Sequence, residues 1–169
     1  MAETTLKTET IEAIRTHAKR FPEPSGALLT SLRMAEREVG FVNADVCAQV
    51  ADALEMAPAK VWGVLSFYTT FRLETDGKYL VYICSTLPCA LRGSENIFDH
   101  LASKLGIGLN ETTADGLFTL KKAECIGACG NAPAMQVNDD YYENLSIQKL
   151  DEIIDDLKEG KSPARHVTV

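Results

Sequence analysis

The hydrophobic pattern of this chain changes its period once, at the turn signal Asp76-Gly77. Before that turn, apolar side chains recur at the spacing of amphipathic helices. After it, Tyr79-Leu-Val-Tyr-Ile83 is a continuous apolar run, which is typical of a strand buried on both faces. We therefore expect a helical domain over residues 1–75, a domain with a β-sheet over residues 76–160, and a C-terminal tail over residues 161–169.

Four helices are predicted in the first domain, and together they should form a helical bundle. A helix that carries Ile11 and Ile14 ends before Pro22, and a second ends at Gly40. Asn43 can cap a third helix, and Pro58 suits the first turn of a fourth.

The second domain has the order strand, helix, strand, hairpin, helix, which makes the predicted fold class α+β. After the first strand comes a helix near residues 90–105, and then a second strand, Leu117–Lys122. A right-handed crossover through the helix would make these two strands parallel. Asn138-Asp-Asp140 marks the hairpin, and Ser146 can cap the last helix.

Cysteine pairs follow both of the predicted parallel strands. Cys84 ends the first strand and Cys89 lies five residues further on, while Cys125 and Cys129 follow the second strand. The carboxyl ends of neighbouring parallel strands lie at one edge of a sheet, where ligands commonly bind. The two pairs are therefore expected to meet in space.

Four thiolates suit either a [2Fe-2S] cluster or a structural zinc ion. Zinc modules usually space the cysteines of each pair by two residues, and both gaps are wider here. A [2Fe-2S] core takes two sulfurs at each end, which favours iron over zinc. A zinc module that only scaffolds a partner stays open as an alternative. No histidine lies beside the cysteines, so a Rieske-type site is not expected.

The residues around the second pair leave two points open. Gly127 and Gly130 either let backbone N–H groups approach the cysteine sulfurs or merely shape a turn. Pro133 can follow a cis or a trans peptide bond. The fifth cysteine, Cys47, lies among apolar residues of a predicted helix and is interpreted as a small buried hydrophobe.

Composition excludes several classes of function. The net charge is -7 and no Lys/Arg stripe interrupts it, which argues against nucleic-acid binding and docking on anionic lipid. No apolar run reaches membrane-spanning length, and the N-terminus resembles neither a signal peptide nor a mitochondrial presequence. We therefore expect a cytoplasmic protein whose thiols stay reduced. A thiol-disulfide oxidoreductase is disfavoured because Cys-x-x-Cys is absent.

Several motifs carry a resemblance to a known family. They are the segments 63–68, 84–93, 124–133 and 138–143, which read GVLSFY, CSTLPCALRG, ECIGACGNAP and NDDYYE. Together they resemble the 24 kDa (E) subunit of respiratory complex I, the NADH:quinone oxidoreductase. The resemblance covers nearly the whole chain, from the first helix to about Gly160, and the four-cysteine pattern is highly specific.

The resemblance implies a thioredoxin-like [2Fe-2S] domain, with a four-stranded mixed sheet and flanking helices, after the helical bundle. It implies that Cys84, Cys89, Cys125 and Cys129 are the iron ligands and that the chain has no catalytic acid or base. It also implies an F (51 kDa-type) partner that carries FMN, a [4Fe-4S] cluster and the NADH site. The chain does not show the presequence of mitochondrial members, so a bacterial protein is expected. It would transfer electrons within a peripheral arm at the cytoplasmic face of the inner membrane, without inserting into it.

Two other interpretations are compatible with this resemblance or with part of it. Related subunits serve NAD-reducing hydrogenases and NAD-dependent formate dehydrogenases, so the larger complex is less specific than the cluster. A thioredoxin-like ferredoxin that acts alone is the other possibility. The long helical half argues against it, because those helices carry more apolar surface than a small appended domain needs.

Overall fold

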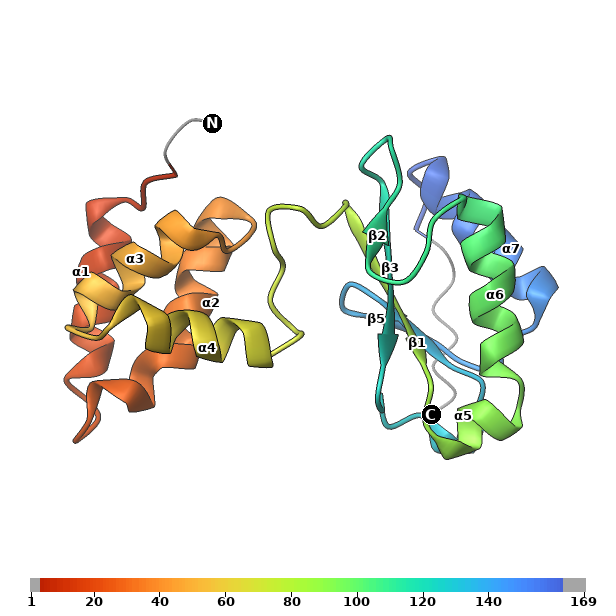
Figure 1. The fold of residues 1–169 in the computed structure, drawn as a ribbon, viewed down its shortest axis with the longest axis horizontal. Coiled ribbons are helices and arrows are strands. Elements are labelled where there is room, and N and C mark those ends of the chain that lie inside the picture. Colours follow the sequence, from red (N-terminus) through yellow and green to blue (C-terminus); the bar gives the residue numbers. More distant parts are fainter. Residues whose placement is uncertain (1–3, 163–169) are drawn as a thin grey trace. The chain divides into compact units, whose positions relative to one another are not determined.

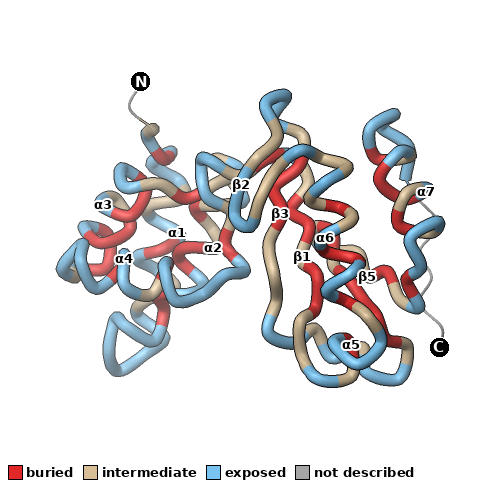
Figure 2. The backbone as a smooth tube through the Cα atoms, turned by 45° about the vertical axis from the view of Figure 1, so that its right-hand side comes forward, coloured by how far each residue is buried: buried red, intermediate tan, exposed pale blue. Residues whose placement is uncertain are grey.

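The computed structural model describes residues 4–162. The chain divides into two compact units, of which the first ends at Glu74 and the second begins at Thr75. Each unit encloses a buried hydrophobic core of its own (Figure 2). Most of the tail expected over residues 161–169 lies outside the described residues. Within residues 4–162, no helix has the length and apolar character needed to cross a bilayer.

The N-terminal unit contains the four helices expected from the periodicity. They are α1 (Thr8–Ala18), α2 (Leu28–Val39), α3 (Ala44–Ala53) and α4 (Pro58–Phe67). Gly40 ends α2 in the left-handed conformation with φ 92°, and the Asn43 side chain accepts a hydrogen bond from the Val46 N–H at 3.0 Å. The sequence signals that begin and end these helices therefore act as predicted.

The expectation of a simple bundle is not exact. A 3₁₀ helix, η1 (Pro24–Ala27), precedes α2, and a single parallel β-bridge pairs Val42 with Leu73. The four α-helices share one core, to which each contributes a fully buried apolar side chain: Ile14, Leu32, Val50 and Val61. Burying such a side chain stabilises a fold by roughly 1.5–3 kcal/mol.

The C-terminal unit is built on a five-stranded sheet in the order β2-β3-β1-β4-β5 (Figure 1). The strands are β1 (Tyr79–Cys84), β2 (Glu111–Thr112), β3 (Phe118–Ala123), β4 (Met135–Val137) and β5 (Asp140–Tyr142). β1 and β3 run parallel, and the other neighbouring pairs run antiparallel. The prediction of four strands is wrong because β2 has two residues, too few to show an alternation of apolar and polar side chains.

Helices α6 (Ser94–Leu105) and α7 (Ile147–Lys158) cover one face of this sheet (Figure 1). Alternate residues of the central strand, Val81 and Ile83, belong to the same buried cluster as Leu101 of α6 and Ile154 of α7. The Ser146 hydroxyl accepts a hydrogen bond from the Lys149 N–H at 3.2 Å, so the predicted cap of α7 is confirmed. Between β1 and α6 lies the short helix α5 (Leu87–Leu91).

Candidate functional site

The central parallel strands end level with each other. The register of β1 and β3 runs from Tyr79 opposite Phe118 to Cys84 opposite Ala123. One residue further, the Ser85 N–H and hydroxyl both donate hydrogen bonds to the Ala123 carbonyl, at 2.9 and 3.0 Å. The predicted parallel pairing is confirmed. The segments that carry both cysteine pairs consequently leave the sheet at the same edge.

The first pair of cysteines is buried and in contact. Cys84 and Cys89 are each 2 % exposed and share a small apolar cluster with Ala132 and Ala134. Cys84 ends β1, Cys89 lies in α5, and the Cys89 thiol donates a hydrogen bond to the Cys84 sulfur. The Cys84 N–H donates to the Ala134 carbonyl at 3.1 Å, just beyond a peptide bond, Ala132–Pro133, that is cis.

The second pair of cysteines is exposed. Cys125 lies in the loop after β3, and Cys129 begins the 3₁₀ helix η2 (Cys129–Asn131). Cys129 is near enough to Cys89 for its charge to raise the pKa of that thiol. Within residues 4–162, no three histidine, cysteine, aspartate or glutamate side chains are grouped as ligands of a single metal ion. The structure thus brings Cys84 and Cys89 together, with Cys129 within electrostatic reach.

The environment of Cys84 lowers the pKa of its thiol. Burial raises the pKa of this thiol, but the N–H groups of Thr86 and Ile126 hydrogen-bond to its sulfur, and the net effect holds its pKa below the ordinary value. Burial, together with the proton that it donates to Cys84, raises the pKa of Cys89 to about 11. One donor therefore comes from the segment after β1 and the other from the segment after β3.

The backbone donors differ from those expected at the glycines. The N–H groups at the two buried sulfurs belong to Thr86, Ile126 and Ala134. Gly127 adopts φ +80°, so it shapes the turn that presents Ile126. No pattern of residue types marks a backbone donor in advance, because every residue except proline carries an N–H. Thr86 was not identified from the sequence either. Its only signal there is its position between Cys84 and Cys89.

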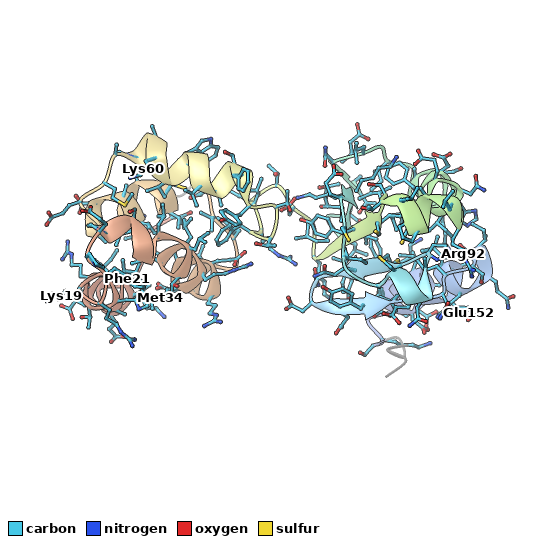
Figure 3. The ribbon with its side chains drawn as sticks, turned by 90° about the horizontal axis from the view of Figure 1, so that it is seen from below. Lys19, Phe21, Met34, Lys60, Arg92 and Glu152 are labelled. Atoms are coloured by element: carbon cyan, nitrogen blue, oxygen red, sulfur yellow. The ribbon has the colours of Figure 1, made fainter. Side chains whose placement is uncertain are left out.

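The surface beside the cysteines is apolar and open. A pocket of about 270 Å³ adjoins Cys129, and its lining includes Leu91 and Arg92. Leu87 and Leu91, on α5, are 67 % and 79 % exposed. Arg92 is exposed as well, and its side chain extends from the C-terminal unit in Figure 3. Such a patch of exposed leucines is typical of a surface that meets another protein.

Cys47 takes no part in this site. It lies in α3 of the N-terminal unit, it is 2 % exposed, and burial raises its pKa to about 11. The interpretation of Cys47 as a buried apolar side chain is confirmed.

The residues of the site suit an iron-sulfur cluster. Thiolates are its usual ligands, and N–H groups directed at the sulfurs help to hold it and to set its potential. Three such donors are present at Cys84 and Cys89. The model of the thioredoxin-like [2Fe-2S] ferredoxin family matches residues 14–158. The chain belongs to this family.

Curated relatives agree with the resemblance drawn from the cysteine motifs. The E subunit of the NADH-quinone oxidoreductase of Rickettsia conorii is 43 % identical over 154 residues, which cover 90 % of this chain and 89 % of the relative. The E 2 subunit of the NADH-quinone oxidoreductase of Rhizobium meliloti is 39 % identical over 147 residues, which cover 87 % and 88 %. The predicted membership of this ferredoxin family is confirmed.

A solved structure shares the fold. The crystal structure of an NAD⁺-reducing [NiFe]-hydrogenase in the air-oxidized state aligns with a TM-score of 0.69 at 22 % identity. The alignment covers 79 % of this chain and 23 % of the hydrogenase chain, so this family member spans about a quarter of that protein's length.

Proposed function

We propose that this chain is the electron-transfer (E) component of an NADH:quinone oxidoreductase and holds one [2Fe-2S] cluster on Cys84, Cys89, Cys125 and Cys129. The observation that carries the proposal is the level ending of β1 and β3, which directs both cysteine-bearing segments to one sheet edge. The names of the two relatives, both of them E subunits of such an enzyme, support the assignment to this complex.

The protein's own part is to bind the cluster, shield it and adjust its charge. A [2Fe-2S] cluster supplies reversible one-electron chemistry when bound. The apolar surroundings of Cys84 and Cys89 exclude water from one side, since Ala132 and Ala134 are buried against them. The N–H groups of Thr86 and Ile126 offset negative charge on the Cys84 sulfur. No acid or base is required, because the transferred particle is an electron.

The electron donor in this proposal is a partner. It would be an F (51 kDa-type) subunit that binds FMN and NADH, and it would supply one electron to this chain. A [4Fe-4S] cluster would also belong to that partner. The exposed leucines Leu87 and Leu91 support a protein partner here, because covering them would bury apolar surface beside the cysteines. The chain would then lie in a peripheral arm at the cytoplasmic face of the bacterial inner membrane.

The diaphorase part of a hydrogenase or formate dehydrogenase is the alternative assembly. The likeness to the hydrogenase is one of fold, at 22 % identity, whereas the two curated relatives align at 43 % and 39 % over most of their length. The curated relatives therefore favour complex I.

Metal analysis and spectroscopy of the purified chain test the cluster. We expect about two iron atoms per chain, visible absorption, and an electron paramagnetic resonance (EPR) signal after reduction. One zinc ion per chain, with no iron and no visible absorption, would overturn the proposal and leave a structural scaffold. Isolation of the native complex through this chain tests the partner, which should be a flavoprotein that oxidises NADH.

A further inference from the structure

The segments 124–133 and 138–143, which both carry the resemblance to the E subunit, contact each other in the fold. Asn131 belongs to the first segment, and its side-chain N–H donates a hydrogen bond to the Glu143 carboxylate at 2.7 Å. Glu143 is the last residue of the second segment, and both side chains are half-buried. The proposed function uses the cysteines of the first segment and gives no role to the second.

Backbone hydrogen bonds reinforce this contact. The Asn144 N–H donates to the Asn131 carbonyl at 2.7 Å, and the Leu145 N–H donates to the Pro133 carbonyl at 3.0 Å. The loop between β5 and α7 is therefore hydrogen-bonded along the chain that directly follows the cysteine-bearing loop 124–130. Asn131 takes part through both its side chain and its backbone, and it bonds to two consecutive residues of that loop.

This contact lies very near Cys129. Cys129 and Asn131 are the first and last residues of the short 3₁₀ helix η2, and the Asn131 N–H donates to the Ala128 carbonyl at 3.1 Å. The side chain of Cys129 is exposed, so burial in a core does not fix its position. A displacement of Asn131 would move the Cys129 sulfur as well, because a single tight turn joins the two residues.

The beginning of the loop 124–130 is held by a different contact. The Ser85 N–H and hydroxyl donate to the Ala123 carbonyl, and so they hold the chain just before Cys125. The bonds at Asn131 hold the chain just after Cys129. The loop that carries the two exposed cysteines is thus attached at both of its ends.

We propose, on the basis of the proposed function, that the hydrogen bond between Asn131 and Glu143 positions Cys129 as a ligand of the cluster. A hydrogen bond to a carboxylate is stronger than one between neutral groups, which suits a contact that has to hold an exposed ligand in place. Asn131 is a positioning residue, since it acts through the turn that carries Cys129. Without the bond, the loop would open more often and Cys129 would leave iron more readily.

Two variants of the full chain and one control test this role, each purified with its cluster. Asn131→Asp replaces the donor by a second carboxylate. The double variant, Asn131→Asp with Glu143→Gln, exchanges donor and acceptor and restores one amide–carboxylate pair. Gln148→Glu is the matched control, because Gln148 makes the same kind of hydrogen bond to Glu152, at 3.2 Å, on α7, a helix without a cysteine.

The measurements are the rate of iron loss to a chelator and the EPR spectrum of the reduced cluster. We expect Asn131→Asp to lose iron about tenfold faster than the parent chain and to shift the g values, because two carboxylates repel each other. The double variant should return both readings to those of the parent chain, and Gln148→Glu should leave both unchanged. Circular dichroism of the iron-free proteins checks that each variant keeps its fold.

Four results would overturn the proposal. They are equal iron loss in Asn131→Asp and the parent chain, and an equally fast loss in Gln148→Glu. The third is a double variant that stays as fast as Asn131→Asp, since the effect would then come from the charge on residue 131 and not from the pair. The fourth is faster iron loss with an unchanged EPR spectrum, which would assign the pair to the stability of the loop rather than to the position of Cys129.

A second substitution keeps the test decisive if Asn131→Asp does not fold. Asn131→Ala removes the donor without adding a charge, and it too should lose iron faster and shift the g values. An Asn131→Ala variant that matches the parent chain in both readings overturns the proposal. A parent chain without iron would instead defeat the proposed function itself, and that result is visible before any variant is made.

Discussion

Cys84 and Ala123 lie directly opposite each other at the last position of the parallel pair β1–β3. This single register relationship decides where both cysteine segments leave the sheet. A shift by one residue would turn Cys84 to the other face, where it could not join Cys89 in the buried cluster. The site therefore depends on the pairing of two strands that the chain connects only through α5, α6 and β2.

Replacement of a buried cysteine separates cluster ligands from packing residues. We expect Cys89→Ser to lose most of the bound iron, or to change the EPR spectrum, because oxygen replaces a thiolate ligand. Cys47→Ala is the matched control, since Cys47 is equally buried but lies in the other unit. It should keep its iron and lose about 1 kcal/mol of unfolding free energy. Iron content and visible absorption distinguish the two, and an intact cluster in Cys89→Ser would remove Cys89 from the ligand set.

A substitution in the core between α7 and the sheet should destabilise the protein more than a substitution on the exposed surface of α7. Ile154, in α7, is fully buried against the sheet, and Glu152 is exposed two residues away (Figure 3). Ile154→Ala leaves a cavity, and we expect it to cost about 2–5 kcal/mol. Glu152→Ala should change the unfolding free energy by no more than about 0.5 kcal/mol. Urea denaturation measures both, and equal effects would mean that α7 does not dock as described.

Asp151 couples the stability of α6 and α7 to pH. Hydrogen bonds from His100 and Lys104, each at 2.9 Å, hold the pKa of Asp151 below its ordinary value of 3.8, against a smaller effect of burial. Because the folded-state pKa is the lower one, this stabilisation is present above pH 3.8 and is lost as the pH falls through the folded-state pKa. Asp155 also faces Lys104, at 3.0 Å, and keeps part of the pairing in any variant.

The corresponding experiment compares Asp151→Asn with the parent chain across this range. The parent chain should be more stable near neutral pH, and the difference should shrink as the pH falls below about 4. Asp99→Asn, an exposed change of the same charge on α6, is the control. A difference that stayed constant down to a pH of about 3 would contradict the assignment.

Local signals in the sequence predicted most of the fold. Helices begin after Asn43 and Ser146, and one ends at Gly40. The capping side chains and the backbone freedom of glycine act within one helical turn, so their effect can be predicted without knowing the tertiary contacts. The right-handed crossover rule also predicted that β1 and β3 run parallel. The strand β2 was not predicted, because its two residues form a strand only by pairing with β3.

The sequence predicted that both cysteine segments leave the sheet at one edge, but it predicted less of the site's surroundings. Cysteine is a recognisable residue type, and the spacing of the pairs relative to strand ends indicated their meeting. The donors at sulfur come from Thr86, Ile126 and Ala134, which are set by loop conformation rather than by residue type. The cis bond before Pro133 was likewise left open by the sequence.

The two glycines near the cysteines should respond differently to the same substitution. Gly127 has φ +80°, a conformation that costs a residue with a Cβ roughly 1–2 kcal/mol. Gly130 has no such φ, and a Cβ added there would meet nothing within 4 Å. Gly127→Ala should therefore lose about 1 kcal/mol of unfolding free energy and release iron faster, because Ile126 moves away from Cys84. Gly130→Ala should match the parent chain in urea denaturation and in the rate of iron loss to a chelator. If both variants behave alike, the turn at Gly127 does not hold the Ile126 donor in place.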